Sequence, residues 1–298
     1  RRFLEDTAMP PIDDAAQRTA GLAAAAAAVE ETFGISIDDF TLGVDAVGGA
    51  FETAGRSAIT PPDPEIPQDA EAAAFFDVDN TLIQGSSLIL LAEGLFRRRY
   101  ITLKELWPAL IKQLRFRLSG AENADDIAEG REQALAVVKG KSVAELKEAC
   151  REIVDRHMIG KSYDATVELA AMHLAAGQQV WLVSATPVQI GQALAERLGF
   201  TGALGTVAEE DDGKFTGRLV GDILHGPGKK HAVAALAALE KLDLSKCTAY
   251  SDSINDLPML EMVGAPVAIN PDRALRRHAR AQGLSLIHIS EPTRLLSI

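Results

Sequence analysis

The chain has 298 residues, 47% of them hydrophobic, which is enough to bury the core of one large domain or two modest ones. Its formal net charge of −12 gives no long-range attraction for polyanions, so we expect no nucleic-acid partner. No apolar run approaches the roughly 20 residues of a membrane span, so we expect no transmembrane segment. The two cysteines, Cys150 and Cys247, are typical of reduced thiols in a cytoplasmic protein rather than of a disulfide scaffold.

Residues 1–70 are expected to form a helical N-terminal extension. Alanine-rich and weakly amphipathic patterns predict helices near residues 14–33 and 37–54. The proline-rich run 60–67 favours extended backbone and is typical of a linker, and no catalytic constellation precedes it. Because the chain begins with arginine rather than methionine, a fragment of a larger fusion protein stays open as an interpretation.

The most informative stretch follows this linker. Residues 72–76 form a short apolar run, typical of a strand buried on both faces of a parallel sheet. Asp77 and Asp79 come directly after it, where the carboxyl ends of parallel strands face the ligand crevice of open α/β sheets. An aspartate pair there can hold a hard cation and offer one oxygen as a nucleophile. Taken alone, the Asp-x-Asp-x-Thr pattern leaves a simple strand-to-turn cap as the alternative.

Residues 86–177 show helical periodicity throughout. Leucines recur at helical spacings from Leu88 to Leu95 and again from Leu106 to Leu114. An insertion of about 90 residues between the first strand and the second is too long for an ordinary crossover connection. We therefore expect a separate helical cap in this part of the chain.

Strand character returns at three short runs, residues 179–183, 248–250 and 266–269. Helical stretches separate these runs, and this alternation predicts an α/β fold with a doubly wound parallel sheet. Its core would comprise residues 71–85 and 178–283. An Asp-Gly pair within residues 207–219 predicts a β-hairpin flap beside the sheet.

Two further segment ends carry polar groups suited to phosphate. Ser184 ends the second strand, where Thr186 suits a helix cap and Pro187 suits the first helical position. Lys229 ends a Gly-Pro loop before an alanine- and leucine-rich helix and can neutralise a transferring phosphoryl group. Lys229 and its neighbour Lys230 cannot both point inward. By themselves, a turn serine and a surface lysine are the simpler interpretations.

The third strand ends in a second pair of acids, Asp252 and Asp256, spaced four residues apart across a turn. Asp252 can complete an oxygen ligand set for Mg²⁺, and Asp256 can orient a metal-bound water or the lysine. A helix cap followed by a first-turn acid explains one of these aspartates. It does not explain the whole group of charges.

The order of these motifs resembles that of the haloacid dehalogenase-like phosphohydrolases. The resemblance covers about residues 71–282 and is carried by Asp-Val-Asp-Asn-Thr-Leu from Asp77 and Asp-Ser-Ile-Asn-Asp-Leu-Pro-Met-Leu from Asp252. The helical insertion after the first motif is similar to the C1-type cap of the phosphoserine-phosphatase-like branch, subfamily IB. The resemblance implies a Rossmann-like α/β core, phosphatase activity and Mg²⁺ as cofactor.

By this resemblance, Asp77 is the nucleophile that forms an aspartyl-phosphate, and Asp79 protonates the leaving alcohol and then activates water. Mg²⁺ would be bound by the side chains of Asp77 and Asp252 and by the backbone carbonyl of Asp79. The resemblance also implies substrate or phosphate contacts from four residues, Thr81, Ser184, Ala185 and Lys229. It implies supporting positions behind the metal site for two more, Asn255 and Asp256.

One departure from the family pattern bears on the substrate. Phosphoserine phosphatases place a glutamate nine residues after the nucleophile, where this chain has Ser86, and a cap arginine that would fall near Ala134. A hydroxyl cannot supply the charge that pairs with a substrate ammonium, so we expect a small or lipid-derived phosphomonoester as partner. L-phosphoserine is the alternative substrate. A catalytically silent binding or regulatory module is the alternative of another class.

The final segment, residues 284–298, matches the conceptual translation of a transposase adapter used in sequencing-library preparation. We expect this segment to be an artefact and exclude it from fold reasoning, together with His288. A natural C-terminal strand is the alternative.

Overall fold

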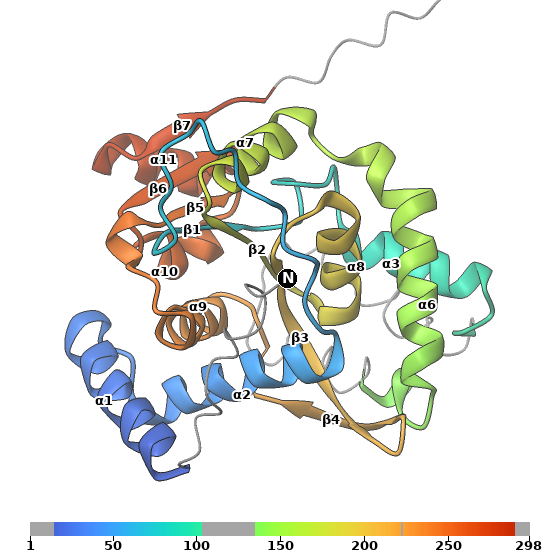
Figure 1. The fold of residues 1–298 in the computed structure, drawn as a ribbon. Coiled ribbons are helices and arrows are strands. Elements are labelled where there is room, and N and C mark those ends of the chain that lie inside the picture. Colours follow the sequence, from blue (N-terminus) through green and yellow to red (C-terminus); the bar gives the residue numbers. More distant parts are fainter. Residues whose placement is uncertain (1–14, 103–134, 222, 290–298) are drawn as a thin grey trace, which may run out of the picture.

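A computed structural model describes residues 15–102, 135–221 and 223–289. Within them, seven strands form one sheet in the order β4-β3-β2-β1-β5-β6-β7, with β1 at the centre (Figure 1). Neighbouring strands are parallel except β3 and β4, so the predicted α/β fold with a largely parallel sheet is confirmed. The strands are β1 (Ala73–Phe76), β2 (Gln179–Pro187), β3 (Gly202–Asp211), β4 (Lys214–Val220), β5 (Thr248–Ser251), β6 (Ala265–Ile269) and β7 (Ser285–Ile287).

Helices flank both faces of this sheet (Figure 1). Their ends follow local chemistry: Ser36 caps one helix by accepting from the Asp39 N–H, and Gly199 ends another at a φ of 73°. The α-helices are α1 (Ala15–Phe33), α2 (Ile37–Thr53), α3 (Ser87–Arg97), α6 (Val143–Ile153), α7 (Asp164–Ala175), α8 (Val188–Leu198), α9 (Pro227–Glu240), α10 (Leu257–Leu260) and α11 (Arg273–Gln282). Short helical turns cover residues 154–158, 159–161, 244–246 and 254–256.

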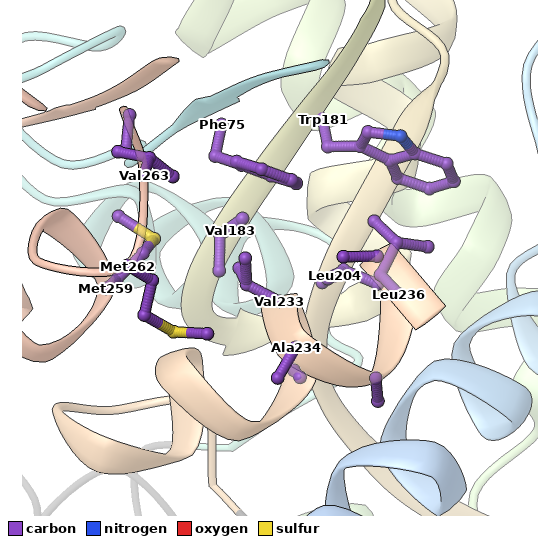
Figure 2. Close-up of a cluster of buried hydrophobic side chains, with 14 of the residues drawn as sticks. Phe75, Trp181, Val183, Leu204, Val233, Ala234, Leu236, Met259, Met262 and Val263 are labelled. Atoms are coloured by element: carbon purple, nitrogen blue, oxygen red, sulfur yellow. The ribbon is translucent and has the colours of Figure 1, made fainter. Parts of the chain in front are cut away.

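The core lies in two layers because side chains alternate across each strand. Phe75 of β1 packs with Trp181 of β2 on one face, against α9 and the region of α10 (Figure 2). Phe76, the next residue, points to the opposite face and packs among side chains of α6, α7 and α8. All four residues of β1 are buried, as predicted for a strand covered on both sides.

The N-terminal helices begin at Ala15 and Ile37, close to the predicted positions. Helix α2 does not stand apart from the sheet domain. Its residues Phe40, Val47 and Ala50 are buried in the cluster that contains Phe75. The description of residues 1–70 as an extension therefore omits a helix that shares the central core.

The proline-rich segment crosses the amino ends of the strands (Figure 1). Backbone N–H groups of Ser57, Asp63 and Asp69 donate to the carbonyls of Thr201, Ala175 and Ala176 at 3.3, 2.9 and 2.9 Å. We name residues 57–69 the strap. Where the proline content predicts a linker, the strap instead satisfies carbonyls at the C-terminal end of α7, which leads into β2, and at Thr201, directly before β3.

The part of the cap region that the structure describes is helical. Two connecting segments join this region to the sheet domain and bond to each other. The Gln84 N–H donates to the Lys161 carbonyl and the Tyr163 N–H to the Leu82 carbonyl, both at 2.9 Å. The rest of the predicted cap, residues 103–134 with Ala134, lies outside the described residues.

The predicted hairpin is formed by β3 and β4. Asp212 and Gly213 both have positive φ, 47° and 71°, as a primed two-residue turn requires. The tip of this hairpin bonds to the cap, with the Val143 N–H donating to the Gly213 carbonyl at 3.0 Å.

The tail segment begins with β7, which pairs with β6 as a parallel edge strand. The segment interpreted as an adapter artefact thus adds Ser285–Ile287 to the sheet, as a short alternating apolar run can do at an open edge. None of the helices in the described ranges is long and apolar enough to cross a membrane.

Candidate active site

Asp77 lies at the carboxyl edge of the sheet, one residue beyond β1. Its N–H donates to the Tyr250 carbonyl at 2.9 Å, which extends the β1–β5 ladder past the strand. The chain then turns sharply: the Leu82 N–H donates to the Val78 carbonyl at 3.0 Å, and Asn80 has a φ of 56°. This local geometry brings Asp77 and Asp79 out of the strand into a tight loop, with Asp77 buried and Asp79 half-buried.

Lys229 joins Asp77 to Asp256. Helix α9 begins after Gly226, whose φ is 53°, and Lys229 lies in its first turn. Its Nζ donates to Asp77 Oδ1 at 2.5 Å and to Asp256 Oδ2 at 2.7 Å, and all three residues are at most 7% exposed. Ser251 Oγ also donates to Asp256 Oδ2 at 2.7 Å. Asp256 is therefore held by two donors and in turn orients the lysine.

The electrostatics of this cluster are dominated by burial. Burial raises the pKa of Asp77 to about 7, and the charges of Asp256 and Asp252 add to this against the opposing effect of Lys229. Burial also raises the pKa of Asp252 to about 7, with a further contribution from Asp256. Burial alone would lower the pKa of Lys229, but Asp77 and Asp256 outweigh it and hold that pKa above its usual range. Three carboxylates face one ammonium, so the site attracts a cation.

Asp79 points away from this cluster toward the cap. The backbone N–H of Ser87 donates to Asp79 Oδ1 at 2.9 Å, and Ser87 Oγ bonds to the same oxygen. Ser87 is fully buried and is the first residue of α3, the first helix of the predicted cap region. The position of the Asp79 carboxylate is therefore tied to that of α3.

Ser184 lies at the same edge, because β1 and β2 pair in parallel with Phe76 opposite Leu182. Its Oγ lies 2.9 Å from Thr186 Oγ1 and accepts from the Thr186 N–H at 3.2 Å, so the hydroxyl is bonded within its own turn. Helix α8 begins at Val188 with Pro187 at the cap, so the prediction of Pro187 as first helical residue is wrong by one position. Strand β2 continues through that proline, which displaces the helix start.

Comparison with known proteins identifies the chain. The model of the family described as HAD, haloacid dehalogenase-like hydrolase, matches residues 74–261. The chain belongs to this family. It is 57% identical over 221 residues to a protein named phosphoserine phosphatase SerB1 from Mycobacterium tuberculosis, covering 74% of this chain and 72% of that one. It is 30% identical to a histidinol-phosphatase of Neisseria meningitidis, covering 72% of this chain and 97% of the relative.

A solved structure supports the same assignment. A protein of unknown function from Bordetella pertussis is 29% identical and superposes with a TM-score of 0.66, covering 74% of this chain and 100% of that protein. With the family match and the phosphatase-named relatives, these findings make the chain a haloacid dehalogenase-like phosphatase, a hydrolase of phosphomonoesters.

The donor set of this phosphatase suits Mg²⁺. In the described residues, no group of three or more His, Cys, Asp or Glu side chains is arranged as a metal cage. Mg²⁺ does not need one, because it is usually bound by one or two carboxylates together with water and substrate oxygens. Asp77 and Asp252 supply two carboxylates whose pKa values are raised by burial and unbalanced negative charge. The residues present therefore fit a hard divalent cation.

The remaining predicted positions of the phosphatase differ in burial. Thr81 is fully buried, and its Oγ1 has no hydrogen-bond partner within the described ranges. Ala185 and Asn255 are exposed. Lys230 points away from the site, with its Nζ donating to the Phe33 carbonyl at 2.7 Å, so Lys229 is the lysine that faces the acids.

Two contacts of the site were not foreseen from the sequence. Ser87 and Ser251 each hold one of the aspartates, yet a serine at a helix start or strand end is common for capping alone. The available signal was position: Ser87 opens the first predicted helix after the motif, and Ser251 directly precedes Asp252. Neither position shows, without the fold, which carboxylate it will meet.

Proposed function

We propose that this phosphatase uses Asp77 as the nucleophile and hydrolyses a small phosphomonoester through an aspartyl-phosphate. One observation carries the proposal: a buried carboxylate at the carboxyl edge of the sheet, 2.5 Å from a lysine that a second carboxylate holds in place. Attack by an Asp77 oxygen on phosphorus forms the O–P bond as the bond to the leaving alcohol breaks. Water then attacks the same phosphorus, which releases inorganic phosphate and restores Asp77.

Asp79 is suited to the proton transfers of both steps. As an acid it donates a proton to the leaving alkoxide, and as a base it then takes a proton from the attacking water. Its half-buried carboxylate, anchored through one oxygen by Ser87, lies on the loop between the nucleophile and the cap.

A magnesium ion would be held by the side chains of Asp77 and Asp252 and the carbonyl of Asp79. When bound, it supplies positive charge that lets an anionic substrate approach an anionic nucleophile. Lys229 supplies the other fixed positive charge beside Asp77. Thr81 lies in the turn after β1, and Ser184 and Ala185 lie in the last part of β2. We propose that the side chains of Thr81 and Ser184 and the backbone at Ala185 contact the phosphoryl oxygens.

The substrate we propose is a small or lipid-derived phosphomonoester without a charged ammonium next to the phosphate. Ser86, nine residues after Asp77, is uncharged. It occupies the N-cap position of α3, but its side chain makes no capping hydrogen bond there. It therefore offers no counter-charge to an ammonium. L-phosphoserine is the second candidate, favoured by the name of the 57% identical relative from Mycobacterium tuberculosis.

The reaction is tested by measuring phosphate release from p-nitrophenyl phosphate with and without Mg²⁺. We expect Mg²⁺-dependent turnover that Asp77→Asn and Asp252→Asn abolish and that Asp211→Asn, on the exposed end of the hairpin, leaves largely intact. Equal inactivity of wild type and Asp77→Asn at saturating Mg²⁺ would support the alternative of a catalytically silent module.

The substrate is tested with a panel of phosphoserine, histidinol phosphate, a sugar phosphate and lysophosphatidate. We expect phosphoserine to be a poor substrate, and Ser86→Glu to raise kcat/KM for phosphoserine while the neutral control Ser86→Gln does not. A strong preference of the wild type for phosphoserine contradicts the argument from Ser86 and selects the second candidate.

A further inference from the structure

Helix α2 packs against the helix that carries Lys229, although it lies outside residues 74–261 matched by the family (Figure 1). In Figure 1 α2 lies directly below α9. Phe40, Val47 and Ala50 of α2 are buried in the same cluster as Val233 and Leu236 of α9. The packing is extensive enough to make α2 part of the surroundings of the lysine helix.

At Gly43 the two helices meet backbone to backbone. A Cβ placed on Gly43 would lie 2.4 Å from the carbonyl oxygen of His231 and 2.7 Å from its carbonyl carbon. Real Cβ atoms essentially never approach another heavy atom to less than 3.0 Å. His231 is two residues beyond Lys229 in the same helical turn. Only glycine at position 43 therefore allows the backbone of α2 to contact the turn of α9 that contains Lys229.

The same stretch of α2 also contacts the chain that precedes α9. A Cβ on Gly221 would lie 2.7 Å from the Leu42 carbonyl oxygen and 2.8 Å from the Ala46 nitrogen. Gly221 has a φ of 69° and follows directly on β4, whereas His231 lies inside α9. One turn of α2 thus contacts the chain both before and after Lys229.

A third contact comes from the neighbour of the catalytic lysine. Lys230 Nζ donates at 2.7 Å to the carbonyl of Phe33, the last residue of α1. Lysine donors suit the unpaired carbonyls at a helix C-terminus. The two N-terminal helices therefore both contact the first turn of α9.

We infer that α2, through Gly43, is a positioning element for Lys229 in the phosphatase reaction. This inference rests on the proposed function, because it concerns the placement of Lys229 against Asp77. Lys229 Nζ lies 2.5 and 2.7 Å from its two carboxylate partners, so a displacement of about 1 Å exceeds the range of at least one hydrogen bond. Restoring the 2.4 Å distance between a Cβ at Gly43 and the His231 carbonyl oxygen to the 3.4 Å of ordinary contact requires a movement of about 1 Å. Misplacement of a catalytic group by about 1 Å is enough to lower a rate as much as 100-fold.

The test compares three alanine substitutions on α2 in the full chain. Gly43→Ala meets the His231 backbone, Gly49→Ala meets the side chains of Val220 and Val207 at 3.0 and 3.1 Å, and Gly48→Ala meets nothing within 4 Å. All three make the same change in helix propensity. Gly49→Ala is the control for crowding without contact to the lysine turn, and Gly48→Ala is the control for the substitution itself.

The measurements are kcat and KM with p-nitrophenyl phosphate, the affinity for inorganic phosphate in the presence of Mg²⁺, and thermal unfolding. We expect Gly43→Ala to lower kcat and phosphate affinity by about tenfold or more, with both controls within about twofold of wild type. If Gly43→Ala lowers the unfolding temperature but leaves kcat and phosphate affinity unchanged, α2 is only structural and the inference is overturned.

Hydrogen exchange separates this inference from the proposed function. In protein without substrate, we expect Gly43→Ala to speed exchange selectively in peptides covering residues 223–231, whereas a general loss of stability speeds it throughout. An inactive wild type overturns the proposed function, and the exchange result then decides alone whether α2 holds the lysine segment. If Gly43→Ala does not fold, Val47→Ala on α2 replaces it, because Val47 is fully buried in the cluster that α2 shares with α9. A phosphate affinity about fivefold below wild type supports the positioning role of α2, and an unchanged affinity overturns it.

Discussion

The carboxyl and amino edges of the sheet, where the parallel strands end and begin, carry opposite kinds of interaction. At the carboxyl edge, Asp77, Lys229 and Asp256 are charged, buried and bonded to one another. At the amino edge, the strap is held by backbone bonds and neutral side chains, such as the bond from Thr60 Oγ1 to the Gly199 carbonyl at 2.6 Å. The strands therefore start beside exposed groups held mainly by backbone bonds and end beside a buried cluster of charges.

This difference predicts which property, activity or stability, a substitution at each edge should change first. Burying two carboxylates with one ammonium, beside the half-buried carboxylate of Asp252, opposes folding, and such an arrangement persists where function requires it. Satisfying backbone carbonyls in the segments that lead into β2 and β3 stabilises the fold and leaves the reacting groups untouched. We therefore expect changes at the carboxyl edge to act on activity first and changes at the amino edge to act on stability first.

The largest contrast is between two lysine–carboxylate pairs. Lys229 is buried between Asp77 and Asp256, whereas Lys246 at the amino edge is 42% exposed and pairs with Glu71. We expect Lys229→Met to lower kcat/KM by about 100- to 1,000-fold, because it removes the fixed positive charge beside the phosphoryl group. Lys246→Met should leave the kinetics unchanged, because exposed ion pairs contribute little. Steady-state kinetics on both variants checks this, and comparable losses of activity would remove the contrast between the edges.

A smaller effect is expected at Ser87, which links the carboxyl edge to the cap. Ser87→Ala removes the hydroxyl bond to Asp79 and leaves the backbone bond in place, so we expect kcat to fall about tenfold and its pH profile to shift. Ser86→Ala is the matched control and should leave hydrolysis of p-nitrophenyl phosphate unchanged. A pH profile identical to that of wild type would mean that Ser87 only packs at the start of α3.

The raised pKa values of Asp77 and Asp252 make stability and metal binding at the carboxyl edge depend on pH. Burial and neighbouring charge raise the pKa of Asp77 and of Asp252 to about 7, from an ordinary value near 4. Between those values the metal-free folded protein binds more protons than the unfolded chain, so its stability falls as the pH rises from about 4 to about 7. Mg²⁺ must displace these protons, so its affinity should rise over the same window. Urea unfolding and Mg²⁺ calorimetry across this range measure both trends, and Asp252→Asn should flatten them. An unaltered slope in that variant contradicts the assignment.

The smallest effect is expected in the strap. Gln68 Nε2 donates to the carbonyls of Asp63 and Ile66 at 2.7 and 2.6 Å on an exposed surface. We expect Gln68→Ala to lower the free energy of unfolding by no more than about 1 kcal/mol and to leave kcat unchanged. Denaturant unfolding and steady-state kinetics check this, and a loss of activity without a loss of stability would contradict the separation of the two edges.

The sequence predicts those parts of the site and fold that depend on local patterns. Strand β1, the aspartates that follow it and the hairpin turn at Asp212 each arise from a few consecutive residues and one rule of periodicity or turn chemistry. The contacts of Ser87, Gly43 and the strap arise where segments far apart in sequence meet. No local pattern encodes the approach of Gly43 to His231, because a helix glycine is equally compatible with open space, as at Gly48.

The central claim is that Asp77 carries the phosphoryl group during turnover. Its most direct test is rapid quenching of enzyme, Mg²⁺ and substrate, followed by borohydride reduction and mass spectrometry of the peptide that contains residue 77. Reduction of an aspartyl-phosphate yields homoserine, so we expect homoserine at position 77 only when substrate was present and Asp79 unchanged. Phosphate release at full rate with no label at Asp77, or with the label on another aspartate, would contradict the account.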